Sequence, residues 1–391
     1  MRTIPTLTFL MMVGAGIGVV VGIHTLGSTQ PKTTLVSPLA LSQVSTESKI
    51  LGLTKSSTKT LPKSVSILLL GLDARIGDTR PRCDAIHLFQ LHPWAHSLRI
   101  TTIPRGTIVA GDTLPDGGTY IGNLCHYQGI EAVMKKVAGL TGVTPDYYAT
   151  IGFSQSVGIL RTLGLPTTST LQFLRSRNTA LGDHQRSHNQ AVFMRDFILT
   201  NTKYVAKIPK PLRYLLYQLV QTNMEYETAS QLFEDFIQNG IADSPANIEL
   251  VTVPDLGHSI NDRHYSSVVT TAIEGQGSEG DFLTYQATVE GYLKSLIARA
   301  TNQLQLKRSK AAYELIKTPF SQRIWLQVEE ADTRELYHYQ IVEIMMRSNP
   351  DRGAASSLLL DYIAEMETFG YGNYAQKATQ LLDSFTSSPE A

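Results

Sequence analysis

Short apolar runs separated by turn residues mark the region from residue 65 to residue 107. Residues 67–70 form a continuous apolar run, which is typical of a buried strand. Residues 85–92 and 98–103 are two further strand-like runs, and the turn-like residues 93–97 lie between them. The pattern predicts three neighbouring strands and places the polar residues that flank them at strand ends.

Apolar residues at helical spacing appear after residue 127. They share one face of a helix predicted over residues 128–140 and are Ile130, Val133, Met134, Val137 and Leu140. Ser154 is suited to capping a helix that follows the next strand. The same criteria predict strands at residues 146–153 and 247–253 and helices at residues 154–164, 183–200, 211–221 and 228–239. This arrangement fits an α/β domain with a central sheet.

From residue 282 onward the pattern changes to consecutive helices. They are predicted over residues 282–305, 309–317, 333–347, 354–369 and 373–385. The glycine-rich, acidic residues 274–281 precede them, and we place a domain boundary there. The sequence therefore predicts an all-α C-terminal extension over residues 281–391. We expect such an extension to bind a protein partner or to pack on its own domain.

The N-terminal region is suited to a membrane anchor. Residues 3–31 contain no Asp, Glu, Lys or Arg, and residues 4–23 are long enough to cross a bilayer. Arg2 lies on the short side, which favours a cytoplasmic N-terminus and an extracytoplasmic bulk. The alternative is a cleaved signal peptide, although no clear small-x-small cleavage site follows the apolar core. The expected division is a cytoplasmic tip and transmembrane anchor at 1–26, a Ser/Thr/Pro-rich stalk at 27–62 and a globular domain at 63–275.

Composition narrows the class of protein. The 391 residues are 42% hydrophobic and 17% charged, as in a globular chain, and the formal net charge is zero. A neutral chain argues against a general nucleic-acid surface, so we expect no nucleic-acid partner. Cys83 and Cys125 are the two cysteines. In an oxidising compartment they are either a disulfide that braces the neighbouring segments or two free buried thiols.

Carboxylates and arginines gather at the predicted strand ends. Asp73 and Arg75 follow the first strand, Arg82 and Asp84 precede the second, and Arg105 follows the third. Strand ends are where α/β sheets commonly bind ligands. Carboxylates suit Mg²⁺, and arginine binds phosphate oxygens with two parallel hydrogen bonds, so the set fits a metal-bound phosphate or pyrophosphate. The alternative is a network of ion pairs that only fixes the loops.

The order of these motifs resembles the LytR-CpsA-Psr (LCP) family, whose members attach glycopolymers to the cell wall outside the cytoplasm. The matching segments are Gly71-Leu72-Asp73, Arg82-Cys83-Asp84, Ile103-Pro104-Arg105-Gly106-Thr107, Arg175-Ser176-Arg177, and Arg186 with Gln190. The resemblance covers about residues 63–256 and does not reach the helical extension. It implies an LCP-like αβα domain with a central mixed sheet flanked by helices.

The resemblance also implies an activity, a cofactor and partners. A peptidoglycan hydroxyl would attack a polyprenyl-pyrophosphate-linked glycan, and polyprenyl phosphate would leave. Asp73 and Asp84 would hold Mg²⁺, or Mn²⁺ in its place, and would act with Arg105 as the catalytic residues. The general base is not identified. The implied pyrophosphate-binding residues are Arg75, Arg82, Arg175, Arg177, Arg186 and Gln190.

Other implications of the resemblance compete with simpler interpretations. Val133, Met134 and Val137 would line a tunnel for the polyprenyl chain, or they are ordinary core residues. Gly106 stands where the family has Asp, Asn189 stands where many members have a second arginine, and the segment after Gly164 is short. Two other functions stay open: a non-catalytic wall-associated module that binds lipid-linked glycan, and a polyprenyl-pyrophosphate pyrophosphatase.

Overall fold

The computed structural model describes residues 64–74, 78–109, 120–162, 182–208, 210–255, 257, 260–263 and 279–387, together with Thr170 and Leu174. The expected anchor at 1–26, the stalk at 27–62 and most of the expected boundary segment lie outside these residues. Within the described part, none of the helices combines the length and apolar character that crossing a membrane requires.

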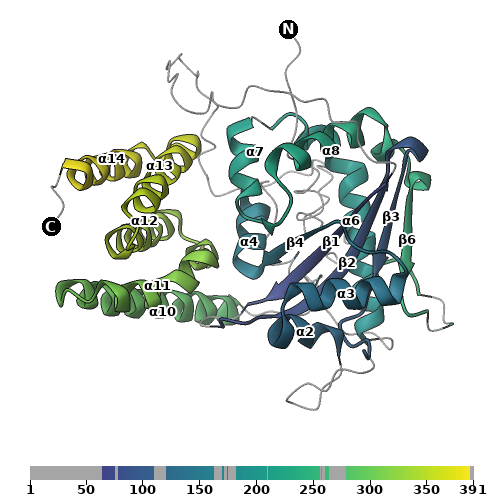
Figure 1. The fold of residues 1–391 in the computed structure, drawn as a ribbon, viewed down its shortest axis with the longest axis horizontal. Coiled ribbons are helices and arrows are strands. Elements are labelled where there is room, and N and C mark those ends of the chain that lie inside the picture. The colour runs from purple at the N-terminus through teal and green to yellow at the C-terminus, as the bar shows by residue number, and fades with distance from the viewer. Residues whose placement is uncertain are drawn as a thin grey trace, which may run out of the picture.

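A six-stranded sheet forms the centre of the N-terminal part (Figure 1). Its strands in chain order are β1 (Val65–Asp73), β2 (Arg82–His92), β3 (Ser97–Thr102), β4 (Tyr147–Gly152), β5 (Gln221–Thr222) and β6 (Ile248–Thr252). They are arranged in the order β5-β4-β1-β2-β3-β6. The pairs β1–β4 and β3–β6 are parallel and the other pairs are antiparallel, so the mixed central sheet is confirmed.

Helices cover both faces of this sheet because the strands alternate apolar side chains between two cores. The helices of this part are α2 (Ile121–Gln128), α3 (Ile130–Thr141), α4 (Phe153–Thr162), α6 (Gly182–Val205), α7 (Lys210–Tyr217) and α8 (Tyr226–Gln238). Ile67 and Leu69 of β1 pack in the core beneath α6 and α8, whereas Leu68 and Leu70 pack in the core beneath α2 and α3. The short 3₁₀ turn η2 (Pro93–Ala95) connects β2 to β3, and η3 (Ile241–Asp243) and η4 (Pro245–Asn247) lie between α8 and β6.

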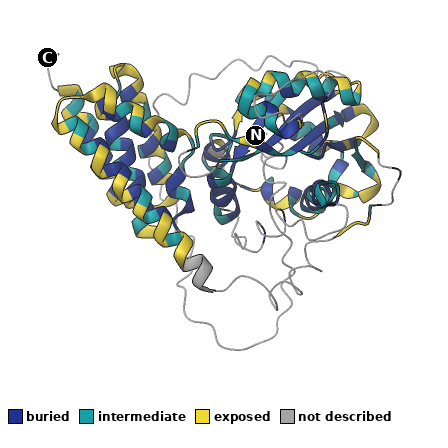
Figure 2. Cartoon of the chain, turned by 90° about the horizontal axis from the view of Figure 1, so that it is seen from below, coloured by how far each residue is buried: buried dark blue, intermediate teal, exposed yellow. Residues whose placement is uncertain are grey.

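The C-terminal part is helical, as predicted. Its elements are α10 (Glu279–Gln305), α11 (Ser309–Ser321), η5 (Ile324–Gln327), α12 (Ala331–Ser348), α13 (Arg352–Phe369) and α14 (Gly372–Ser387). Each helix turns a buried stripe inward and an exposed stripe outward (Figure 2). Two apolar clusters result, one centred on Trp325 between α10, α11 and α12, and the other between α12, α13 and α14.

The short turn η5 fastens the helical extension to α4 of the sheet domain. Buried Gln327 donates its Nε2–H to Oγ of Ser154 over 2.7 Å. A Cβ at Gly158 would lie 2.8 Å from Leu326, so the glycine lets η5 approach α4 closely. Ser154 lies inside α4 and contacts the extension, so its expected role as a helix cap was wrong.

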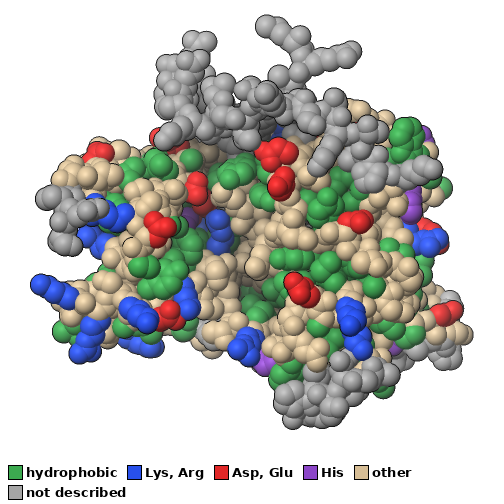
Figure 3. Space-filling model, viewed as in Figure 1, with side chains coloured by type: hydrophobic (Ala, Val, Ile, Leu, Met, Phe, Trp, Pro, Cys, Tyr) green, Lys and Arg blue, Asp and Glu red, His purple; other side chains and the backbone are tan. Residues whose placement is uncertain are grey.

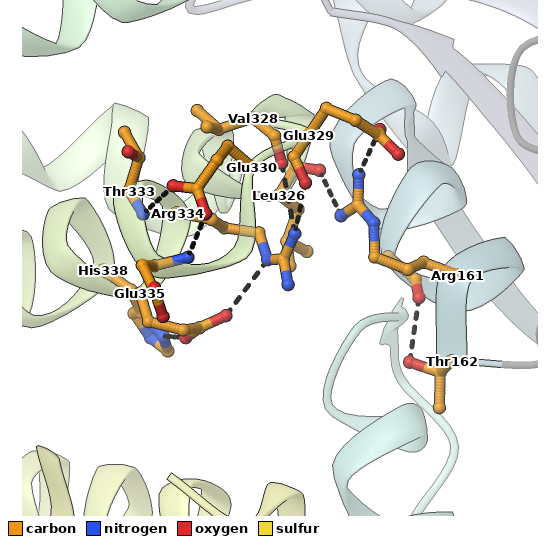
Figure 4. A network of polar contacts seen from close by, with 12 residues as sticks. Arg161, Thr162, Leu326, Val328, Glu329, Glu330, Thr333, Arg334, Glu335 and His338 are labelled. Atoms are coloured by element: carbon orange, nitrogen blue, oxygen red, sulfur yellow. Dashed lines mark hydrogen bonds and ion pairs between the residues drawn. The ribbon is translucent and has the colours of Figure 1, made fainter. Parts of the chain in front are cut away.

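Arg161 of α4 continues the same contact with a charged network (Figure 4). Its guanidinium donates to the carbonyl of Leu326 over 2.9 Å and to Glu329 over 3.0 Å. On the far side, buried Arg334 donates to the carbonyl of Glu329 over 3.1 Å and to Glu335 over 3.0 Å. Buried polar groups of this kind are costly when unpaired, so the two parts are held in one relative position.

Candidate functional site

An irregularity between β1 and β2 orients the first site carboxylate. Leu72 pairs with Cys83 and Gly71 pairs with Ala85, which leaves Asp84 as an extra residue in β2. Cys83 therefore faces the core under α2 and α3, while Asp84 turns toward α6 on the other face. A β-bulge of this kind commonly redirects a side chain next to a site.

Arg105 lies between two carboxylates. It follows β3 in a turn that is closed by a hydrogen bond from the Thr107 N–H to the Pro104 carbonyl over 2.9 Å. Its Nη1–H donates to Oδ1 of Asp84, and its Nε–H donates to Oδ2 of Asp183 over 3.4 Å. Burial lowers the pKa of Arg105, but Asp84 and Asp183 outweigh this effect and raise it. Arg105 is therefore a fixed, permanently charged cation.

Arg186 lies beside this group and is almost fully buried. Its Nη2 is 3.2 Å from Oδ1 of Asp183 and donates to the Asp84 carbonyl over 3.3 Å. Burial lowers its pKa, Arg105 adds to the effect, and Asp183, Asp84 and Asp73 oppose it. Its Nε–H has no hydrogen-bond partner among the described residues. A buried donor without a partner commonly marks the place of an ordered water or ion.

Gln190 lies one turn further along α6 and is held by two partners. Its Oε1 accepts a hydrogen bond from Nε2 of His87 over 3.2 Å, and its Nε2 donates to the Leu174 carbonyl over 2.9 Å. Burial, with a smaller effect of the nearby Arg186 charge, lowers the pKa of His87 to about 4, although the hydrogen bond with Gln190 opposes this shift. His87 is therefore neutral near pH 7 and fixes the direction of the Gln190 amide.

A disulfide joins Cys83 to Cys125, with Cα atoms 5.8 Å apart, so of the two alternatives the disulfide is the one found. It ties the start of β2 to α2. Gly122 in the same helix donates its N–H to the Arg105 carbonyl over 3.0 Å. A Cβ at Gly122 would lie 2.8 Å from the Cys83 carbonyl and 2.9 Å from Cβ of Arg105, so only glycine permits this approach.

The connection between β1 and β2 is held from two sides. His126 of α2 donates Nδ1–H to the Arg80 carbonyl. Gln322, at the end of α11, donates Nε2–H to the Asp78 carbonyl. The helical extension thus touches the loop that joins Asp73 to Arg82.

The structure brings together several of the predicted site residues. Asp84, Arg105 and Arg186 form one contiguous group, and Asp73 acts electrostatically on it. Arg82 is exposed and lies opposite Asp73 in the register of β1 and β2. Arg75, Arg175 and Arg177 lie outside the described residues, so their roles stay predictions.

Asp183 is the site residue that the sequence reasoning missed. It was assigned only to a helix start, yet it contacts both Arg105 and Arg186. The available signal was its position three residues before Arg186 on the same helix, where side chains share a face.

Two of the three departures from the family pattern now have a structural context. A Cβ at Gly106 would lie 3.3 Å from Oδ2 of Asp183, so the glycine leaves the space that this carboxylate occupies. Buried Asn189 accepts a hydrogen bond from Gln185 over 2.7 Å within α6. The segment after Gly164 lies outside the described residues.

Val133 and Val137 are fully buried in the core under α2 and α3, and Met134 packs against it. Their packing is that of core residues, and the tunnel lining stays a prediction.

The site offers a metal ion two carboxylates, those of Asp73 and Asp84. The described residues contain no group of three or more His, Cys, Asp and Glu placed to hold a metal ion. Asp73 ends β1 and Asp84 lies near the start of β2, and Arg105 donates a hydrogen bond to Oδ1 of Asp84. A cation held by Asp73 and Oδ2 of Asp84 would need further oxygen ligands. Mg²⁺ commonly takes these from phosphates and water, so the donor set fits this ion.

Residues 36–165 match the model of the LytR_cpsA_psr family, so the resemblance seen in the sequence is confirmed over that range. No protein with a curated description matches the chain.

Solved structures with similarity include TagV from B. subtilis, at 17% identity over 55% of this chain and 98% of that one, with a TM-score of 0.37. TagT bound to LI-WTA gives 18% identity over 55% of this chain and 92% of that one, also with a TM-score of 0.37. The Lin1025 protein from Listeria innocua gives 16% identity over 54% and 97%, with a TM-score of 0.35.

Proposed function

From the match of residues 36–165 to the LytR_cpsA_psr family, we propose that this chain transfers a glycopolymer from a polyprenyl-pyrophosphate carrier to a peptidoglycan hydroxyl. The chain would be anchored in the cell membrane by one N-terminal helix, with its N-terminus in the cytoplasm and its bulk outside. Its substrates would be the lipid-linked glycan and the peptidoglycan acceptor.

The observation that carries the proposal is the pair of arginines held by shared carboxylates. Arg105 and Arg186 both contact the carboxylate of Asp183. Arg105 also contacts the side chain of Asp84, and Arg186 contacts the backbone carbonyl of the same residue. Two guanidinium groups fixed side by side present the planar N–H donors that bind phosphate oxygens. Because they are already oriented, little reorganisation is needed when charge develops during phosphoryl transfer.

The reaction requires one bond to form and one to break. The acceptor oxygen bonds to the glycan-side phosphorus, the bond from that phosphorus to the bridging oxygen breaks, and polyprenyl phosphate leaves with the bridging oxygen. The acceptor proton passes to a base that is not assigned. Arg105 and Arg186 would bind the oxygens of the two phosphates, and the remaining N–H of Gln190 would orient one of them.

Asp73 and Oδ2 of Asp84 would hold Mg²⁺, with Mn²⁺ as the substitute. When bound, the ion supplies neutralisation of charge on the pyrophosphate oxygens.

The test is turnover of a glycan-linked short-chain polyprenyl pyrophosphate by the full chain in detergent, with peptidoglycan as the acceptor, with and without Mg²⁺. We expect metal-dependent release of polyprenyl phosphate. Arg105→Lys keeps the charge but loses the planar fork, so we expect at least roughly a tenfold loss of rate. Lys135→Arg, at an exposed position of α3, is the matched control and should keep full activity.

Other outcomes of this test favour the alternatives. Tight binding without release, even when peptidoglycan is added, would favour a non-catalytic module that holds lipid-linked glycan. Release in water at an equal rate with and without peptidoglycan would favour a pyrophosphatase. No binding would refute the assignment of this site.

A further inference from the structure

The edge of the helical extension formed by α10 and α11 is strongly basic. Residues 279–321, which span both helices, hold six Lys or Arg and four Asp or Glu, but residues 299–310 hold four of these cations and no acidic residue, a local formal charge of +4 in a chain whose net charge is zero. In Figure 3, Lys and Arg side chains gather at the lower left, over these two helices. All six cations are exposed: Lys294, Arg299, Lys307, Arg308, Lys310 and Lys317.

Most of this charge is not neutralised by the protein. Lys294 lies 3.4 Å from Glu290, and Lys317 lies 2.6 Å from Glu314, so these two cations are paired. Four cations have no carboxylate within ion-pair distance among the described residues, namely Arg299, Lys307, Arg308 and Lys310. Like charges held this close repel each other, and a bound polyanion would relieve that repulsion.

A groove of about 460 Å³ lies between the two helices at the same place. The end of α10 lines one side with Arg299, Asn302 and Gln303, and the start of α11 lines the other. Asn302 and Gln303 offer amide donors and acceptors that suit sugar hydroxyls as well as phosphate. Glu314 also lines the groove, but its ion pair with Lys317 offsets its charge.

The cations that flank the groove are carried on a tight turn. The N–H of Lys307 donates to the Leu304 carbonyl over 2.9 Å, and the N–H of Arg308 donates to the Gln303 carbonyl over 2.8 Å. The backbone between the helices is therefore fixed, and less ordering entropy is lost on binding than in a flexible basic tail.

We propose that this basic groove binds a phosphate-bearing glycan chain, the polymer portion of the substrate that the site at β1 and β2 would transfer. The inference deepens the proposed function and rests on it for the identity of the polymer. The amides of Asn302 and Gln303 favour a sugar-phosphate chain, because they offer hydrogen-bond partners to its hydroxyl groups as well as to its phosphates. The extension would thus bind the glycan while the arginine site binds the pyrophosphate.

The test is binding of a glycerol-phosphate polymer to the full chain in detergent, with dextran of similar size as the uncharged reference. We expect binding to the polymer alone and loss of affinity as salt rises. Lys307→Glu/Lys310→Glu should weaken binding about tenfold or more. Lys135→Glu/Lys207→Glu changes the net charge equally at exposed positions outside the groove, and it should leave affinity within about twofold.

A second variant, Arg299→Gln, removes one charge without adding a negative one, so a folding defect is not expected. It should weaken binding by a smaller factor than the double glutamate variant. Equal losses in both double variants would refute the groove and indicate binding to charge in general. Binding of phosphatidylglycerol micelles through the same residues, without polymer binding, would assign the edge to the membrane. Polymer binding in a chain that transfers nothing would support the groove while refuting the proposed function.

Discussion

The carboxylate of Asp183 lies against the backbone of Gly106, in the space that a side chain at position 106 would enter. From there it reaches Arg105 from α6, a helix that is far from Gly106 in sequence. Asp183 of α6 therefore places a negative charge next to Arg105, which follows β3.

Placing a second carboxylate there should be harmful. We predict that Gly106→Asp lowers both the melting temperature and the rate of transfer, because two carboxylates would share one partly buried space. The double variant Gly106→Asp/Asp183→Asn should recover most of both, since one charge is then removed. A double-mutant cycle on rate and melting temperature measures the coupling, and additive losses would contradict the shared space.

The disulfide should contribute strongly to stability. Cys83 and Cys125 are 42 residues apart, and a crosslink closing a loop of that length is worth about 4 kcal/mol on the chain-entropy argument. We predict that Cys83→Ser/Cys125→Ser lowers the free energy of unfolding by roughly 2 to 4 kcal/mol in a denaturant titration. The wild type under reducing conditions should behave in the same way. A reductant effect that persists in the double variant would point to another cause.

Acid should destabilise the protein through His87. Its pKa in the folded chain is about 4, below the value of 6.5 that an unperturbed histidine has, so the unfolded chain binds the proton more readily. Stability from the neutral form is complete above pH 6.5 and is lost as pH falls toward 4. The loss is on the order of 3 kcal/mol.

The variant His87→Gln keeps a donor for Gln190 and cannot take up a proton in this range. We expect unfolding free energies measured between pH 4 and pH 7 to show a shallower decline in this variant. An unchanged decline would assign the acid sensitivity to other groups.

The helical extension should influence the site through one hydrogen bond. Gln322→Ala removes the donor to the Asp78 carbonyl and releases the loop that follows Asp73. Because a net hydrogen bond is worth about 0.5 to 1.5 kcal/mol, we predict a loss of kcat of roughly two- to tenfold. Gln155→Ala breaks a contact with Ser321 at the same interface without touching the loop, and it is the control.

Hydrogen exchange separates a local effect from a global one in this pair of variants. Residues 78–84 should exchange faster in Gln322→Ala than in Gln155→Ala, at equal melting temperature. Equal exchange in both would show that Gln322 is not a positioning residue.

Much of the fold could be predicted from periodicity. The three strands near residue 65 and the five helices after residue 282 were found within a few residues of their observed bounds, because their apolar spacing is regular. The helix predicted over 128–140 is confirmed as α3, whereas α2, which precedes it and ends before Gly129, was not predicted. The two-residue strand β5 was missed, since so short a segment carries no period.

The candidate site was predictable only in its local parts. Asp73, Asp84 and Arg105 were found because they flank strands that are neighbours in sequence. The bulge that turns Asp84 toward α6 depends on strand register, which residue types do not encode. The contacts of Gln322 and Gln327 join residues more than 170 positions apart, and no local pattern indicates them.

The contact between η5 and α4 bears on how this chain could have arisen. Ser154 and Arg161 of the sheet domain form hydrogen bonds with residues of the extension, including Gln327. Each part therefore depends on the other to pair its polar groups at this contact. An ancestor that gained or lost the extension in one step would have exposed them unpaired, together with the gap at Gly158 that Leu326 fills. Separating the two parts would leave these polar side chains without partners and Leu326 without the surface on which it packs, so this contact couples the stability of the extension to that of the sheet domain.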